Sequence, residues 1–158
     1  MHFVNGLVEK THVGYIVKDV DAAVAQLQEQ LQCALNTQSY IFSPTKAWTN
    51  SVPLEGFALK IAICKIKDNM VFEYIQPISE NGYHYQALMS DGEGLNHVCF
   101  ATEDFDGYHK EFEKMGAEIV FEAEANDPLN GYRRCFYAKL NGLPGVFEVQ
   151  ENAKPYRE

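Results

Sequence analysis

The chain contains the same pattern twice, and this internal repeat limits the folds open to it more than any other feature. The stretch HVGYIVKDVDAAV (12–24) aligns with HVCFATEDFDGYH (97–109), so that a His-Val pair and two aspartates coincide in the two copies. Further along, VFEYIQ (71–76) aligns with VFEVQE (146–151). A repeat of this length predicts two similar structural units in one chain.

Both copies predict the same order of secondary structure. Apolar and β-branched runs predict strands in the first copy near 12–17, 37–43, 57–66 and 69–76. The corresponding runs of the second copy lie near 97–101, 117–123, 133–139 and 145–150. In each copy an aspartate, Asp19 or Asp104, follows the first strand and can cap a helix. Each half is therefore predicted to be βαβββ, with Pro77 ending the last strand of the first half and a loop at 42–50.

The predicted organisation is one domain, residues 1–158, because this length suits a single domain with a real core. It divides into a module at 11–77 and a module at 95–151. The segment between them, 78–94, is rich in Ser, Gly, Asn and Asp and is expected to be a linker with a short helix.

Charge and composition exclude some partners. The net charge of −9 argues against nucleic acid and anionic membranes, which both require a basic surface. The N-terminal sequence does not have the pattern of a signal peptide, and no apolar run approaches the length of a membrane span. The four cysteines, Cys33, Cys64, Cys99 and Cys135, are scattered without a CxxC pair, which is typical of reduced thiols. We therefore expect a cytoplasmic protein.

Four polar residues occupy matching positions on the predicted strands: His12 and Glu73 in the first half, His97 and Glu148 in the second. Taken singly, each histidine is typical of a half-buried, hydrogen-bonded side chain, and each glutamate of an exposed strand face. Taken together, the two pairs can converge if a pseudo-twofold axis relates the halves. Two imidazoles and two carboxylates then form an N2O2 set suited to one divalent ion, such as Zn, Ni, Co, Mn or Fe(II).

The stretches HVGYIVKDVDAAV, VFEYIQP, GEGLNHVCFATEDFD and GVFEVQE resemble the vicinal oxygen chelate superfamily. This superfamily includes glyoxalase I, methylmalonyl-CoA epimerase, extradiol dioxygenases and antibiotic-resistance binding proteins. The resemblance extends over residues 11–151 and is greatest to methylmalonyl-CoA epimerase and its relatives. It implies two βαβββ modules that form a curved, cup-like mixed sheet around a central site, with the helices outside. It also implies a homodimer.

The resemblance places the metal on His12, Glu73, His97 and Glu148, although epimerases often have Gln at the second of these positions. It implies an isomerase or epimerase that transfers a proton next to a carbonyl through a metal-stabilised enolate, acting on an acyl-CoA. One alternative is a glyoxalase I-type lactoylglutathione lyase acting on a thiol hemithioacetal. Another, from a different class, is a non-catalytic protein that binds a small molecule of the antibiotic type.

The resemblance also implies roles for individual side chains. It assigns proton transfer to Glu148 and, through the partial match LEGF, a second acid-base role to Glu55. Asn96 stands before His97 where the epimerases have a second histidine. Arg133 and Arg134, at the start of a predicted strand, are either partners of a substrate carboxylate or phosphate, or solvated edge charges. His84 and His109 are expected at the surface.

Overall fold

The computed structural model describes residues 3–158, which form three α-helices and a single sheet of ten strands. The elements of the first half are η1 (Phe3–Gly6), β1 (Leu7–Ile16), α1 (Val20–Leu31), β2 (Asn36–Phe42), β3 (Lys46–Thr49), β4 (Val52–Pro53), β5 (Leu59–Lys67) and β6 (Met70–Pro77). Those that follow are α2 (Gly82–Asp91), β7 (Gly94–Thr102), α3 (Phe105–Lys114), β8 (Glu118–Asp127), β9 (Gly131–Lys139) and β10 (Val146–Glu151).

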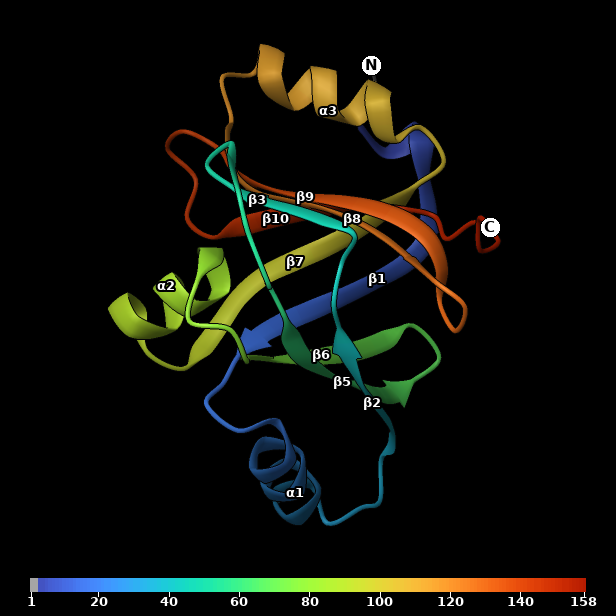
Figure 1. Ribbon diagram of the computed structural model, residues 1–158. Helices are drawn as coiled ribbons and strands as arrows, with labels where there is room; N and C mark the ends of the chain where they lie inside the picture. Colours follow the sequence, from blue (N-terminus) through green and yellow to red (C-terminus); the bar gives the residue numbers. More distant parts are fainter. Residues whose placement is uncertain (1–2) are drawn as a thin grey trace.

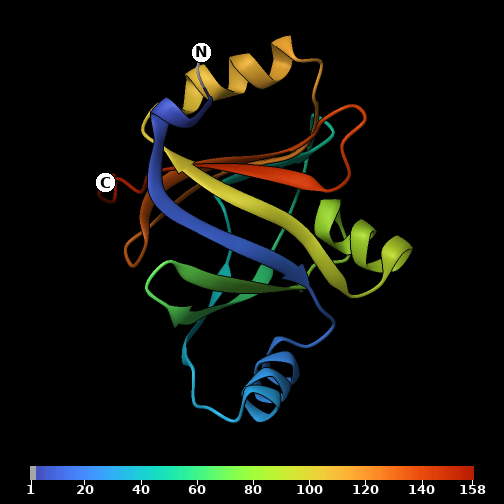
Figure 2. The same ribbon diagram turned by 180° about the vertical axis from the view of Figure 1, so that it is seen from behind.

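The sheet has the strand order β2-β5-β6-β1-β7-β10-β9-β8-β3-β4. The group β2-β5-β6-β1 and the group β8-β9-β10-β7 repeat one arrangement, and the two groups meet where β1 pairs antiparallel with β7. Within each group the strand that comes first in the chain pairs parallel with a later one, β1 with β6 and β7 with β10. The sheet curls so that the two outer parts face each other, as Figures 1 and 2 show. The predicted cup-like α+β fold is therefore confirmed.

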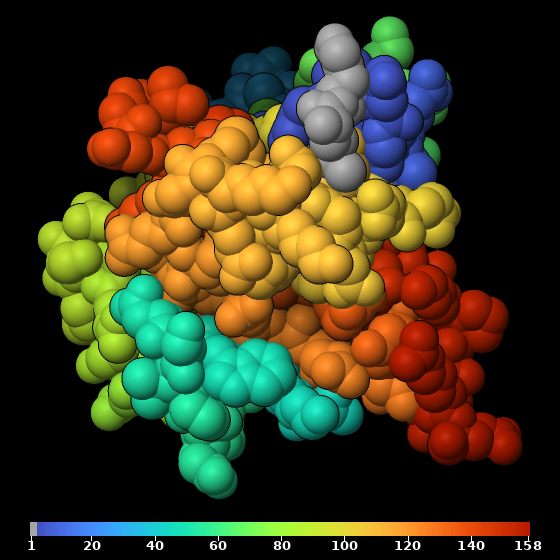
Figure 3. All heavy atoms as spheres, turned by 90° about the horizontal axis from the view of Figure 1, so that it is seen from above, coloured from blue at the N-terminus to red at the C-terminus, as the bar shows by residue number. Residues whose placement is uncertain are grey.

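Helices α1 and α3 lie on opposite outer sides of this cup, and α2 lies beside its open end (Figure 1). Figure 3 views the molecule from the side of α3, which lies across the outside of the second half. Both helices begin as predicted, because Asp19 accepts a hydrogen bond from the backbone N–H of Ala22 and Asp104 from that of Gly107. Such caps satisfy backbone donors that the first turn of a helix leaves free.

Three apolar clusters hold these layers together. The largest fills the interior of the cup and includes Ile75, Phe121 and Tyr137. A second cluster, with Phe112, packs α3 on β9 and β10, and a third, with Val20, packs α1 on the first half of the sheet. None of the described helices combines the length and the apolar character that a membrane span requires.

The structure corrects three details of the predicted elements. Strand β1 begins at Leu7, five residues before the predicted start, and the last residue of β6 is Pro77 itself. Part of the predicted loop at 42–50 is strand β3, which pairs with β8 of the second half. Strand β3 has only four residues, in which buried Ala47 and Thr49 alternate with less buried neighbours. So short a segment cannot be distinguished from a loop by its sequence pattern, and its partner strand β8 is distant in the chain.

Candidate metal centre

The four predicted ligands converge on one point inside the cup. They come from four adjacent strands, β6, β1, β7 and β10, and one ligand atom from each lies within 4.8 Å of the others. The Nε2 atom of His12 lies 3.4 Å from Glu73 Oε1 and 3.2 Å from Glu148 Oε2. The Nε2 atom of His97 lies 3.7 Å and 3.1 Å from the same two oxygens, and 3.4 Å from His12 Nε2.

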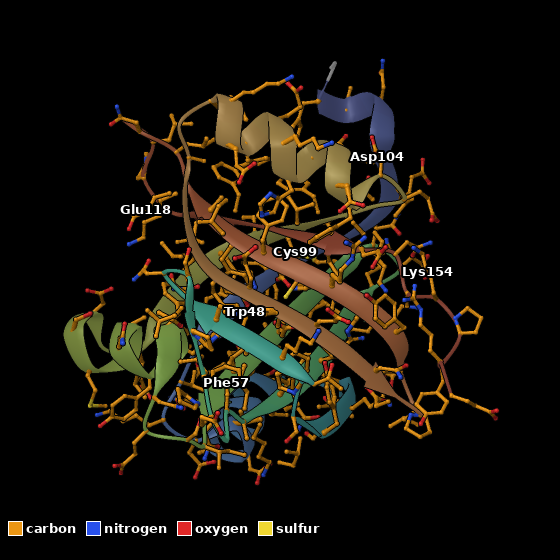
Figure 4. The ribbon with its side chains drawn as sticks, turned by 45° about the horizontal axis from the view of Figure 1, so that its top comes forward. Trp48, Phe57, Cys99, Asp104, Glu118 and Lys154 are labelled. Atoms are coloured by element: carbon orange, nitrogen blue, oxygen red, sulfur yellow. The ribbon has the colours of Figure 1, made fainter. Side chains whose placement is uncertain are left out.

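Strand register explains why these side chains meet. Gly14 of β1 is paired both with Glu73 of β6 and with His97 of β7. Cys99 of β7 is paired both with His12 of β1 and with Glu148 of β10. Because paired residues project from the same face of a sheet, all four ligands point into the cup. Figure 4 labels Cys99, which lies near the middle of the curved sheet.

Gly14 makes room for the imidazole of His97. A Cβ atom added to Gly14 would lie 2.1 Å from Cε1 and 2.3 Å from Nε2 of that ring, which is far inside van der Waals contact. The position related to Gly14 by the repeat is Cys99, opposite His12. The two halves are therefore not symmetric at this point, and His97 is the more deeply buried histidine, 1% exposed against 9% for His12.

The charges of this group are strongly coupled because all four side chains are buried. Burial lowers the pKa of His12, but the nearby negative charge of Glu73 and the hydrogen bonds of His12 outweigh burial and hold this pKa well above its usual value. Burial raises the pKa of Glu148, but hydrogen bonds from His12 and His97 outweigh it and bring this pKa well below its usual range. Two buried carboxylates therefore require positive charge beside them.

The donor set and its spacing fit a divalent metal ion. Ligand atoms that each lie about 2.0–2.2 Å from one ion are separated by about 3 Å or somewhat more, as the four side chains are here. Imidazole nitrogen with carboxylate oxygen suits ions such as Zn, Mn and Fe(II). A divalent cation would also supply the positive charge that the two carboxylates require. The group can thus hold a metal, and the chemistry of the donors does not select which one.

A second layer of hydrogen bonds orients His97. Its Nδ1 atom lies 3.1 Å from the side-chain oxygen of Asn96, whose amide nitrogen donates to the hydroxyl of Tyr83 over 2.9 Å. An amide oxygen only accepts, so Nδ1 donates to Asn96, and Nε2 faces the other three side chains of the centre. Asn96, which stands at the first histidine of the His-His pair in the epimerase pattern, therefore acts as the orienting partner that metal-binding histidines usually have.

The prediction that His84 lies at the surface is wrong. His84 of α2 is fully buried, its Nε2 atom lies 3.1 Å from the hydroxyl of Tyr137, and its Nδ1 atom has no partner among the described residues. The ring of Tyr137 packs on that of His97, with 4.7 Å between ring centres. The linker composition suggested exposure, and nothing local signals that α2 folds against the interior. His109 is half-buried between Glu113 and Glu122.

A small cavity of about 30 Å³ adjoins the two carboxylates of the centre. Glu73 and Glu148 line it together with Tyr137 and mostly apolar side chains from β2, β5 and β8. Arg133 also lines it and donates a hydrogen bond of 3.2 Å from Nη2 to the hydroxyl of Tyr40 on β2. Polar groups that converge in an apolar recess are typical of small-molecule sites.

Two of the remaining candidates lie apart from this centre. Glu55 is exposed between β4 and β5, in a separate shallow hollow, and does not line the cavity. Arg134 touches the cavity, but its guanidinium pairs with Glu151 and Asp106 at 2.9–3.0 Å and stacks on Phe105. Arg134 is thus held by the protein itself, whereas the acid-base role of Glu55 stays a prediction.

Comparison with solved structures finds the same fold in several proteins. A methylmalonyl-CoA epimerase variant from Streptomyces coelicolor, bound to 2-nitronate-propionyl-CoA, is 20% identical with a TM-score of 0.62, over 94% of this chain and 99% of that one. The methylmalonyl-CoA epimerase of Mycobacterium tuberculosis is 17% identical with a TM-score of 0.62, over 96% and 93%. A hypothetical protein of Bacillus halodurans C-125 is 16% identical with a TM-score of 0.61, over 93% and 96%.

At these identities the likeness shows the fold and leaves the reaction open. Curated protein sequences give no match to the chain. A family model does match: residues 11–136 fit the model described as the glyoxalase/bleomycin resistance protein/dioxygenase superfamily. This match covers most of the chain, including three of the four converging side chains, and the doubled strand order and central site agree with it. The chain therefore belongs to the glyoxalase/bleomycin resistance protein/dioxygenase superfamily.

Proposed function

We propose that this protein is a divalent-metal-dependent isomerase of the epimerase type, which moves a proton on a carbon next to a carbonyl. The observation that carries the proposal is the buried convergence of His12, Glu73, His97 and Glu148 within 4.8 Å. An ion bound by these side chains would stabilise the negative charge that develops on the carbonyl oxygen as the neighbouring proton leaves. The likeness in fold to methylmalonyl-CoA epimerases supports this reaction class.

Within this site we assign the proton transfer to Glu148. Its carboxylate lines the cavity, so a substrate carbon held there lies within its reach. The apolar walls from β2, β5 and β8 keep bulk water away, which strengthens the electrostatic interactions inside. Asn96 and Tyr83 keep Nε2 of His97 directed at the centre, and Gly14 leaves space for the ring.

A glyoxalase I-type lyase is the second candidate. Glu73 favours it, because this chain has a carboxylate at a position where epimerases often have Gln. Both reactions use the same proton transfer beside a carbonyl, and they differ in the carbon to which the proton returns. Turnover of the methylglyoxal-glutathione hemithioacetal would favour the lyase, and α-proton exchange in methylmalonyl-CoA the epimerase.

The first experiment measures the metal content of the purified protein. The double variant His12→Ala/His97→Ala is expected to lose at least 90% of the bound divalent metal, because half of the donor set is removed. The variant His109→Ala, which removes a half-buried histidine outside the centre, is expected to keep its metal. Equal metal content in all three proteins would contradict the proposed centre.

Proton exchange is then followed by NMR in D2O with methylmalonyl-CoA and, separately, with the hemithioacetal. Glu148→Gln is expected to slow exchange by about 100-fold or more, which is the range for removal of a general base. The metal content of the same sample separates loss of the base from loss of the ion. Exchange that is unchanged in Glu148→Gln would overturn its role. Tight small-molecule binding by a metal-free wild type would instead indicate a non-catalytic binding protein.

We also propose that the protein works as a homodimer in the cytoplasm. The edge strand β2 has a free side that a second copy can cover. The cysteines are free thiols, as is usual in a reducing compartment.

A further inference from the structure

Among the described residues, Arg133 is the cavity-lining cation that forms no ion pair with a carboxylate. Among the residues that line the cavity, the cations are Arg133 and Arg134, and Arg134 is paired with Glu151 and Asp106. The described ion pairs include none to Arg133, whose hydrogen bond goes to the neutral hydroxyl of Tyr40. A guanidinium has five N–H donors, so most of those of Arg133 remain available to a ligand.

The Arg133–Tyr40 pair has the form of a carboxylate anchor. The hydroxyl of Tyr40 accepts the hydrogen bond from Arg133, so its own O–H remains free to donate. Burial raises the pKa of Tyr40 to about 12, which keeps this proton in place at neutral pH. A guanidinium beside a hydroxyl therefore presents adjacent donors, the arrangement that binds the two oxygens of a carboxylate most strongly.

The pair shares one cavity with the carboxylates of the metal centre, and the charge of Glu73 acts on both Tyr40 and Arg133. On β9, Arg133 and Tyr137 project from the same face, because strand residues alternate in direction, and both line the cavity. Tyr137 is paired with Glu148, so it marks the metal end. Arg133 stands four positions earlier on the same face, and its long side chain reaches the hydroxyl of Tyr40. A ligand that contacts both the centre and this pair has a carbonyl at one end and an anionic group a few carbons away.

The surroundings do not favour a nucleotide carrier on the substrate. The phosphates of a CoA thioester attract a basic rim, but beyond Arg133 and the committed Arg134 the cavity is lined by Glu73, Glu148 and neutral residues. The protein carries a net charge of −9, which repels a polyanion at long range.

From this geometry we infer that the site takes a short, carrier-free carboxylic acid, with its carbonyl at the metal centre and its carboxylate on Arg133 and Tyr40. The inference rests on the proposed function and names the substrate class of the same site. It is an alternative to the acyl-CoA expected from the sequence. It also assigns Arg133 and Tyr40 to substrate binding, whereas Arg134 serves the fold.

Calorimetric titration of the metal-loaded protein tests the inference with malonate, succinate and glutarate as probes. One of these diacids is expected to bind the wild type, with an affinity that depends on chain length because the two ends are held at a fixed separation. Arg133→Gln is expected to weaken this binding by at least 10-fold, and Tyr40→Phe, which removes one donor, by about 3- to 10-fold. Lys46→Gln, which removes one exposed charge outside the cavity, is expected to bind as the wild type does.

Several outcomes would overturn the inference. The first is that no diacid binds to the wild type. The second is that Arg133→Gln and Lys46→Gln weaken diacid binding equally. The third is that propionyl-CoA binds more tightly than every diacid. If the Arg133–Tyr40 bond only braces the two sides of the cup, both cavity variants will have lower melting temperatures and unchanged affinity. Metal content, measured on the same samples, separates this failure from that of the proposed function, which fails if the wild type holds no metal.

Discussion

At the scale of single residues, the neighbours of a buried histidine determine its charge state. His12 and His97 lie beside two carboxylates, which favour positive charge at this point. His84, equally buried, lies beside Tyr137 and apolar rings, and burial lowers its pKa to about 3. Residue type and position in the repeat identified the first two. The third could not be identified, because its burial depends on where α2 packs.

The buried, neutral His84 predicts a loss of stability in mild acid. Its folded-state pKa of about 3 is below the ordinary 6.5, so the unfolded chain takes up the proton first and stability falls as pH drops through 6.5 towards 3. Between pH 7.5 and pH 5 the wild type should lose about 2 kcal/mol more unfolding free energy than His84→Gln does. Urea denaturation of both proteins across this range measures the difference. Parallel pH profiles would show that His84 is not buried as a neutral group.

At the scale of elements, the strand pair β1 and β7 builds the centre of the site. The register pairs Gly14 with His97 and Cys99 with His12, and the missing side chain of Gly14 leaves space for the ring of His97. The repeat in the sequence predicted that each strand carries one histidine of the centre, and both histidines do reach it. It did not predict the role of Gly14, because that role depends on which residue lies across from it. The same limit explains why β3, which pairs only with distant β8, was expected to be a loop.

Gly14→Ala should therefore act through His97. The added methyl group overlaps the imidazole, and overpacking of this kind costs about 1–3 kcal/mol. In a His97→Ala background the overlap is absent, so most of this cost should disappear. Urea denaturation of the four proteins of this double-mutant cycle, all with chelator present, measures the coupling. The same cost in both backgrounds would mean that Gly14 is required for a reason other than space for His97.

At the scale of the whole molecule, the proposed metal joins the two halves of the cup. His12 and Glu73 come from the first half, and His97 and Glu148 from the second. A bound ion should therefore stabilise the entire fold. At a free metal concentration 100 times the dissociation constant the gain is about 2.7 kcal/mol. Chelator should lower the melting temperature of the wild type accordingly.

The variants His12→Ala and His97→Ala, one from each half, should each lose most of this metal-dependent gain. Differential scanning calorimetry with and without metal measures it for all three proteins. Full retention of the gain in either single variant would show that one half binds the ion by itself.

The sequence by itself determined the α+β class, the doubled strand order and the identity of the four converging residues, because these depend on local periodicity and on a repeat that is visible in one dimension. Only the tertiary structure decided what surrounds them: the space above Gly14, the buried His84, the commitment of Arg134 to Glu151 and the freedom of Arg133. These features arise where the curled sheet brings distant strands together. Contacts between strands far apart in the chain leave no periodic signal in either strand. Arg133 and Arg134 are therefore not distinguishable in sequence, because they differ only in the residues that the fold places beside them.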